Sequence, residues 1–101
     1  MPSPTIYFIQ SDDSAGPVKI GYTARPVRFR LAEAQTFHPG RLYVLAEALG
    51  ARSDEAKLHR VFRHLRLSGE WFVYATELRE LVVYLLDGGN LRSWLDEQAG
   101  D

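Results

Sequence analysis

Residues 5–23 read TIYFIQSDDSAGPVKIGYT. β-branched and aromatic residues fill both ends of this stretch, at 5–10 and 18–23, and that composition is typical of β-strands. The middle, 11–17, holds acidic, small and proline residues, which are typical of a turn. The stretch therefore predicts a β-hairpin.

The rest of the chain alternates between helical and extended patterns. Pro26 suits the first turn of a helix, and Ser53 and Thr76 are residue types that cap helix N-termini. Apolar residues recur at helical spacing behind each of these positions. We expect helices over 26–35, from Ser53 to a break at Ser68-Gly69, over 76–86 and over 91–98, with extended segments over 41–49 and 71–74.

This order of elements predicts an α/β (α+β) fold, a small sandwich in which helices flank a sheet. The length of 101 residues fits a single domain, 1–101. We expect its core within about 5–75 and a C-terminal helical extension over 76–99. An apolar stripe in this extension is expected to cover the core and consists of Leu78, Leu81, Val82 and Leu85.

The composition excludes several classes of protein. The chain has no cysteine, so disulfides and cysteine-ligated zinc are excluded and a reducing compartment is expected. No segment approaches the ~20 apolar residues of a membrane span. We therefore expect a cytoplasmic protein with no membrane partner, and its oligomeric state stays open.

The net charge of −1 hides an uneven distribution. Residues 19–66 hold ten basic and four acidic residues, whereas 67–101 hold two basic and seven acidic residues. A basic block attracts an anionic polymer because counterions are released on binding, although arginines on solvated helix faces give the same count. DNA is the expected partner. The candidate DNA-binding residues are Arg25, Arg28, Lys57, Arg60 and Arg63.

Short motifs follow one another in a fixed order along the chain. They are Tyr7-Phe8-Ile9, Val18-Lys19-Ile20-Gly21-Tyr22, Arg30-Leu31 with Gln35-Thr36, Glu55 with His59, and Gly69-Glu70-Trp71-Phe72. In combination they resemble the GIY-YIG nuclease superfamily, and more narrowly its branch named after a coliphage open reading frame and a meiotically up-regulated yeast gene. The resemblance covers about residues 5–75. It implies a three-stranded antiparallel sheet flanked by helices, and a metal-dependent site that cleaves a DNA phosphodiester.

The first two motifs depart from the superfamily pattern. Tyr7 occupies the place of the first motif's tyrosine, but Thr5 replaces the glycine that opens that motif. Lys19 replaces the leading tyrosine of the second motif, as is common in the branch. The resemblance therefore implies catalytic roles for Tyr7 and Lys19, and the lysine leaves open whether standard superfamily chemistry is retained.

The later motifs supply the remaining candidates. Glu55 matches the glutamate that holds the metal, and Arg30 matches the family arginine. The alignment to Arg30 needs one extra residue after Gly21, so Arg28 remains a rival. His59 belongs to a signature of the branch and lies one helical turn after Glu55, where it is a general acid or base, a supporting group or a plain surface partner.

The chemistry of these residue types agrees with the resemblance. Mg²⁺ or Mn²⁺ takes few protein ligands and activates water, so Glu55 alone suffices as a metal ligand; otherwise Glu55 is a helix-dipole partner. Arg30 suits bidentate phosphate contact, and Lys19 suits charge stabilisation. Tyr7 would relay a proton if Lys19 or the metal lowered its pKa; otherwise it is a core tyrosine. We interpret Trp71 and Phe72 as core, and Glu70 as a site residue or a cap.

Three functional hypotheses follow. The first is a metal-dependent endonuclease domain that hydrolyses DNA. The second is a non-catalytic DNA-binding module on the same fold, suggested by the missing glycine and tyrosine. The third is a protein-interaction domain that uses the acidic helical end at 76–101.

Overall fold

The computed structural model describes residues 3–11 and 15–99. Asp12 and Asp13 of the expected turn lie outside the described residues. The elements are β1 (Thr5–Ser11), β2 (Val18–Thr23), α1 (Val27–Thr36), β3 (Leu42–Leu49), α2 (Arg52–Val61), a 3₁₀ turn (Arg63–Leu65), β4 (Arg66–Ser68), β5 (Trp71–Phe72), α3 (Thr76–Leu86) and α4 (Leu91–Ala99).

The described strands form one antiparallel sheet in the order β3-β1-β2-β5-β4. The predicted hairpin is confirmed, because β1 pairs with β2 so that Tyr7 lies opposite Gly21 and Ile9 opposite Lys19. The sheet has five strands rather than the three implied by the resemblance. The difference is the short pair β4 and β5, whose connecting Gly69 has φ 53°. The three long strands β3, β1 and β2 are neighbours and form most of the sheet, so the expected mixed α and β class holds.

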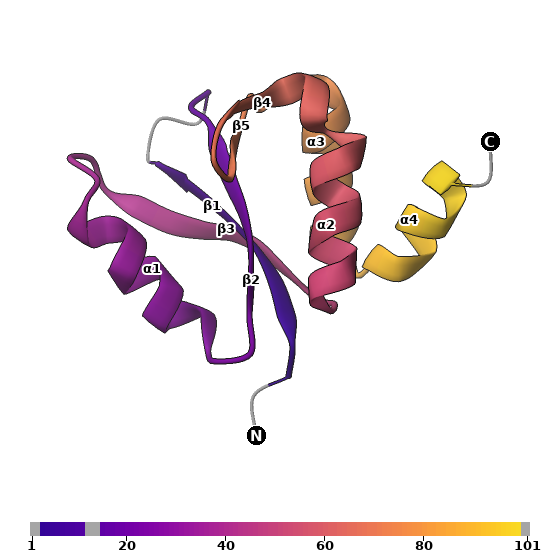
Figure 1. Cartoon of the computed structure of the whole chain (residues 1–101), viewed down its shortest axis with the longest axis horizontal. Helices are drawn as coiled ribbons and strands as arrows, with labels where there is room; N and C mark the ends of the chain where they lie inside the picture. Colours follow the sequence, from indigo (N-terminus) through magenta and orange to yellow (C-terminus); the bar gives the residue numbers. More distant parts are fainter. Residues whose placement is uncertain (1–2, 12–14, 100–101) are drawn as a thin grey trace.

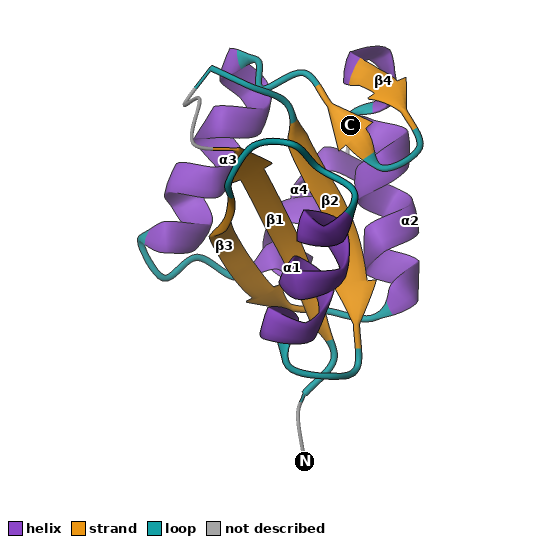
Figure 2. Cartoon of the chain, turned by 90° about the vertical axis from the view of Figure 1, so that its left-hand side faces the viewer, coloured by secondary structure: helices purple, strands orange, loops and turns teal. Residues whose placement is uncertain are grey.

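Helices cover both faces of the sheet (Figures 1 and 2). Alternation along β1 sends Tyr7 and Ile9 towards α1, where they pack with Val27 and Leu42. The opposite side chains, Ile6 and Phe8 among them, belong to a larger core with α2, α3 and α4. The central position of β1 explains why residues 6–10 are all buried.

The C-terminal helices complete the larger core. The expected stripe is confirmed, because Leu78, Leu81, Val82 and Leu85 are all buried in the same cluster as Phe8. Helix α4 adds Leu91 and Leu95 to it. Among the described residues, no helix has the length and apolarity needed to cross a bilayer.

Both predicted helix caps are wrong. The N-cap positions are Ala51 and Ala75, and neither Ser53 nor Thr76 makes the capping bond. In α2 the carboxylate of Asp54 accepts the Ala51 N–H at 2.7 Å, and it also accepts a bond from Arg92 at 2.9 Å. Burial opposes ionisation of Asp54, but these partners outweigh burial and lower its pKa. The carboxylate of Asp54, which also binds Arg92 on α4, therefore takes the capping role that was expected of Ser53.

Candidate functional site

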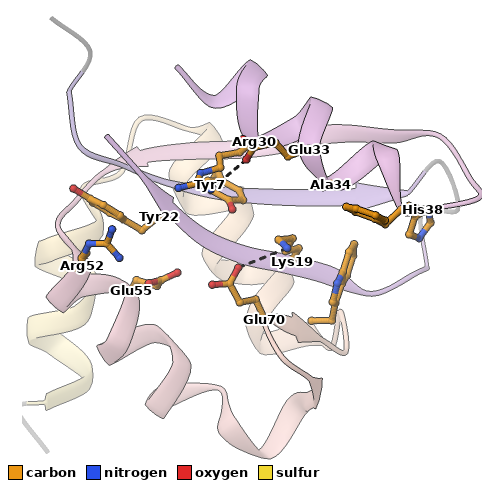
Figure 3. Close-up of a pocket in the computed structure, with 12 residues that line it drawn as sticks. Tyr7, Lys19, Tyr22, Arg30, Glu33, Ala34, His38, Arg52, Glu55 and Glu70 are labelled. Atoms are coloured by element: carbon orange, nitrogen blue, oxygen red, sulfur yellow. Dashed lines mark hydrogen bonds and ion pairs between the residues drawn. The ribbon is translucent and has the colours of Figure 1, made fainter. Parts of the chain in front are cut away.

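A pocket of about 400 Å³ opens between α1, the middle of the sheet and the start of α2. Figure 3 shows Tyr22, Arg52 and Glu55 towards one end and His38 at the other, with Lys19 and Glu70 between them. The pocket therefore brings together Tyr7, Lys19, Arg30 and Glu55, which come from four different elements. Its lining is Tyr7, Lys19, Tyr22, Arg30, Glu33, Ala34, Phe37, His38, Arg52, Glu55, Glu70 and Trp71.

Gly21 makes room for the Tyr7 phenol. A Cβ atom at Gly21 would lie 2.3 Å from both Cζ and Oη of Tyr7, far closer than any real contact of that kind. Only glycine therefore permits this position of the ring, opposite Tyr7 in the hairpin. The phenol of Tyr7 therefore packs directly against the backbone of β2 at Gly21.

Tyr7 is 4% exposed, and its ionisation is disfavoured. Burial, followed by the negative charge of Glu70, raises the pKa of Tyr7 to about 12, against a smaller lowering effect of Arg30. One condition for a proton relay by Tyr7, a pKa lowered by Lys19, is therefore not met. The reason is that the ring lies beneath α1 near carboxylates instead of beside a free ammonium group. Tyr7 remains a protonated phenol at neutral pH.

Lys19 is held by Glu70. The ammonium nitrogen of Lys19 lies 3.7 Å from Oε1 of Glu70, and the backbone N–H of Ile20 donates to the Glu70 carbonyl at 2.9 Å. The short strand β5 thus fixes Glu70 against β2 at the edge of the pocket. The sequence left open whether Glu70 is a site residue or a cap. In the structure Glu70 lines the pocket.

Arg30 enters the pocket from α1, whereas Arg28 does not line it. Nη1 of Arg30 donates to Glu33 at 3.2 Å, and Nε of Arg30 is buried without a hydrogen-bond partner among the described residues. Glu33 is also paired with Arg25, at 2.8 Å. The guanidinium of Arg28 instead lies 4.8 Å from the ring centre of Phe29. Between the two rival arginines, only Arg30 is placed to meet a ligand in the pocket.

Three potential metal ligands meet beside the pocket. One ligand atom each from Glu55, His59 and Glu70 lies within 4.8 Å of the others. Burial and the nearby Glu70 carboxylate raise the pKa of Glu55, and the charge of His59 opposes this. Two carboxylates that repel each other in a half-buried place are stabilised by a cation.

The hydrogen bonds of His59 support the same interpretation. Nε2 of His59 lies 3.0 Å from the carbonyl oxygen of Ile20, so in the neutral ring Nε2 carries the proton and Nδ1 keeps its lone pair. Metal-binding histidines usually donate their other N–H in this way. Two carboxylates and an imidazole are together a set of donors able to hold a metal ion.

Several pocket residues were not predicted from the sequence. Arg52 lies on the same helix face as Glu55, three residues earlier, and its guanidinium is 4.7 Å from the ring centre of Tyr22. That spacing was a usable signal. His38 and Trp71 stack with ring centroids 5.8 Å apart. Trp71 is partly buried against the smaller core cluster and also lines the pocket. No local pattern connects these two residues, which are far apart in the sequence.

The predicted DNA-binding cations lie outside the pocket. All five are exposed: Arg25, Arg28, Lys57, Arg60 and Arg63. The first two border α1, whereas the other three follow Glu55 on and beyond α2. Lys57 and Arg60 follow Glu55 by two and five residues on α2, so they lie on the other side of this helix from Glu55. Contact of these cations with DNA stays a prediction.

One comparison with known proteins identifies a relationship. A family model, the T5orf172 domain, matches residues 4–85. The match spans every residue of the pocket and most of α3. Curated proteins and solved structures give no match.

Proposed function

The chain belongs to the T5orf172 domain family, and we propose that it is a GIY-YIG-type endonuclease domain that hydrolyses DNA phosphodiester bonds with a divalent metal. One observation supports the proposal: a single pocket collects a phenol, three cationic side chains and a carboxylate that belongs to a cluster of three potential metal ligands. The family is associated with nuclease-like and DNA-binding modules, which agrees with this chemistry.

The charge balance of the pocket favours a metal-dependent reaction. Lys19, Arg30 and Arg52 face Glu33, Glu55 and Glu70 among the lining residues, so the pocket alone offers no excess positive charge to a phosphate. A bound divalent ion supplies that charge and lowers the pKa of its water. We propose Glu55, His59 and Glu70 as the residues that hold it.

Arg30 and Lys19 are the proposed phosphate-binding groups. Buried N–H donors are seldom left without an acceptor, and a phosphate oxygen would supply one to the guanidinium of Arg30. The planar fork of arginine fits two phosphoryl oxygens. Lys19 would move from Glu70 towards the phosphate, because once Glu70 binds a cation it attracts the ammonium group less.

Tyr7 is proposed to act as a hydrogen-bonding group in its protonated form. With a pKa of about 12, its hydroxyl donates to a phosphoryl oxygen while its oxygen lone pair orients the attacking water. Hydrogen bonds aimed at developing charge contribute most in a half-buried site, where solvent screens them little. The packing of the Tyr7 ring against Gly21 fixes the position of that hydroxyl.

The test is nicking of supercoiled plasmid with Mg²⁺ or Mn²⁺. We expect the wild-type chain to convert supercoiled to open-circular DNA, and Glu55→Gln to reduce conversion to background. Glu80→Gln is the matched control, because Glu80 is exposed on α3 and does not line the pocket. Equal nicking by Glu55→Gln and Glu80→Gln would reject the assignment of Glu55.

A non-catalytic DNA-binding domain is the second candidate. Lys19 stands where the superfamily has a tyrosine, and its ammonium group is paired with Glu70. A paired ammonium group is less available for catalysis, which favours this candidate. This candidate predicts DNA binding that weakens steeply with salt, needs no metal and leads to no cleavage. Salt titration of binding in EDTA, together with the nicking assay, separates the two candidates.

A further inference from the structure

Three aromatic side chains form one end of the pocket, and we call them the aromatic edge: Phe37, His38 and Trp71. The rings of His38 and Trp71 are stacked, with planes 26° apart. Phe37 is the neighbour of His38 and lines the same pocket, and its side chain is 92% exposed. Neither core packing nor the proposed metal chemistry uses this phenylalanine.

The loop that carries the aromatic edge is held by hydrogen bonds. The side-chain oxygen of Gln35 accepts the Leu42 N–H at 2.8 Å, and its amide nitrogen donates to the Gly40 carbonyl at 2.6 Å. The Gly40 N–H donates to Nδ1 of His38 at 3.1 Å. Phe37 is thus exposed on an ordered loop, so a partner that binds it pays little to order the loop.

The aromatic edge adjoins the phosphate-binding part of the pocket. The ammonium nitrogen of Lys19 lies 5.9 Å from the ring centre of Trp71, and Arg30 lines the same cavity. Aromatic faces beside cations are the combination that binds single-stranded nucleic acids, in which bases stack on the rings and phosphates meet the charges.

We propose that the aromatic edge is a stacking platform for an unpaired nucleobase next to the phosphate held in the pocket. The inference rests on the proposed function and specifies its substrate class: DNA with unpaired nucleotides at the cleavage point. Bases inside a continuous duplex have both faces covered by their neighbours, so they offer none to Phe37. A pocket of about 400 Å³ is large enough for one such unit.

The test measures DNA affinity without cleavage. Two DNAs are compared by fluorescence anisotropy in EDTA and in Ca²⁺: a short duplex, and the same duplex with one unpaired 2-aminopurine nucleotide. We expect tighter binding of the second DNA, and quenching of 2-aminopurine when it stacks. Phe37→Ser should lower that affinity about 5- to 150-fold and leave the duplex affinity unchanged. The matched control is Leu86→Ser, since Leu86 is a large apolar residue exposed on α3, outside the pocket and away from the candidate DNA-binding cations.

The outcomes separate this inference from the proposed function. Equal affinity of the wild-type chain for both DNAs, or no effect of Phe37→Ser, overturns the stacking platform even if the chain nicks duplex plasmid. A chain that binds the unpaired base through Phe37 but never cleaves keeps the platform and rejects hydrolysis. Loss of a dimer on Phe37→Ser in sedimentation, with DNA binding unchanged, also overturns the proposal and assigns the edge to contact between copies.

Discussion

Gly21→Ala is the substitution for which the structure gives the sharpest consequence. The added methyl group would lie 2.3 Å from Cζ and Oη of Tyr7, whereas ordinary contacts begin at 3.4 Å. Gly21 has no positive φ, so alanine is compatible with the backbone. The strain therefore falls on the phenol, which must move by roughly 1 Å.

A displacement of about 1 Å costs ~100-fold in rate when the displaced group is part of a catalytic site. Overpacking of the buried ring is expected to cost about 1–3 kcal/mol in the free energy of unfolding. We therefore expect Gly21→Ala to fold with a lowered melting temperature and to nick plasmid ~100-fold more slowly. Single-turnover nicking rates at saturating DNA, with thermal melts by circular dichroism, measure both effects.

A double-mutant comparison isolates the role of Tyr7. If Gly21→Ala acts by moving the Tyr7 hydroxyl, it adds little further loss of rate to a Tyr7→Phe background. Gly40→Ala is the control, because an added Cβ there meets nothing closer than 3.5 Å. Full nicking activity of a folded Gly21→Ala protein would refute the argument that cleavage depends on the position of the Tyr7 hydroxyl.

Three further predictions test other parts of the account. Arg30→Lys should slow nicking at least about tenfold because lysine cannot form two parallel bonds to phosphate, whereas Arg28→Lys should not; equal effects in rate assays would contradict the placement of Arg30. Tyr7→Phe should lower the rate by a similar factor across pH 6–9, because the pKa of Tyr7 is raised to about 12; a loss that grows with pH would indicate an ionised tyrosine. Asp54→Ala should lower the free energy of unfolding by about 1–2 kcal/mol through loss of the cap on Ala51. Because the folded pKa of Asp54 is lowered, denaturant titrations should show this difference above pH about 4 and its loss as pH falls further.

Local patterns predicted most of the fold. The hairpin, the third strand and the positions at which the helices begin follow from composition and periodicity, since each depends on neighbouring residues. The second helix was expected to reach Ser68-Gly69, but α2 ends at Val61 and is followed by a 3₁₀ turn and β4. The cap of α2 could not be predicted from local sequence. Ser53 and Asp54 are adjacent acceptors, and the choice between them depends on Arg92, which is remote in the sequence. The strand β5 lies within the expected extended segment over 71–74, whereas β4 has three residues, too few to carry a periodic signal.

The candidate site was only partly predictable. Motif order indicated Tyr7, Lys19, Arg30 and Glu55, which the pocket brings together. The raised pKa of Tyr7 depends on burial under α1 and on Glu70, and neither can be read from the residues around Tyr7. The aromatic edge likewise joins a loop after α1 to a strand after α2, so only the folded chain shows it.

The central claim is that the cluster of Glu55, His59 and Glu70 binds a divalent ion on which cleavage depends. The most direct measurement is the rate of plasmid nicking as a function of Mn²⁺ concentration, for the wild-type chain and Glu55→Gln. We expect no nicking in EDTA, a saturable rise with Mn²⁺ for the wild type, and background rates for Glu55→Gln at every concentration. Nicking that persists in EDTA, or equal Mn²⁺ curves for the two proteins, would contradict it.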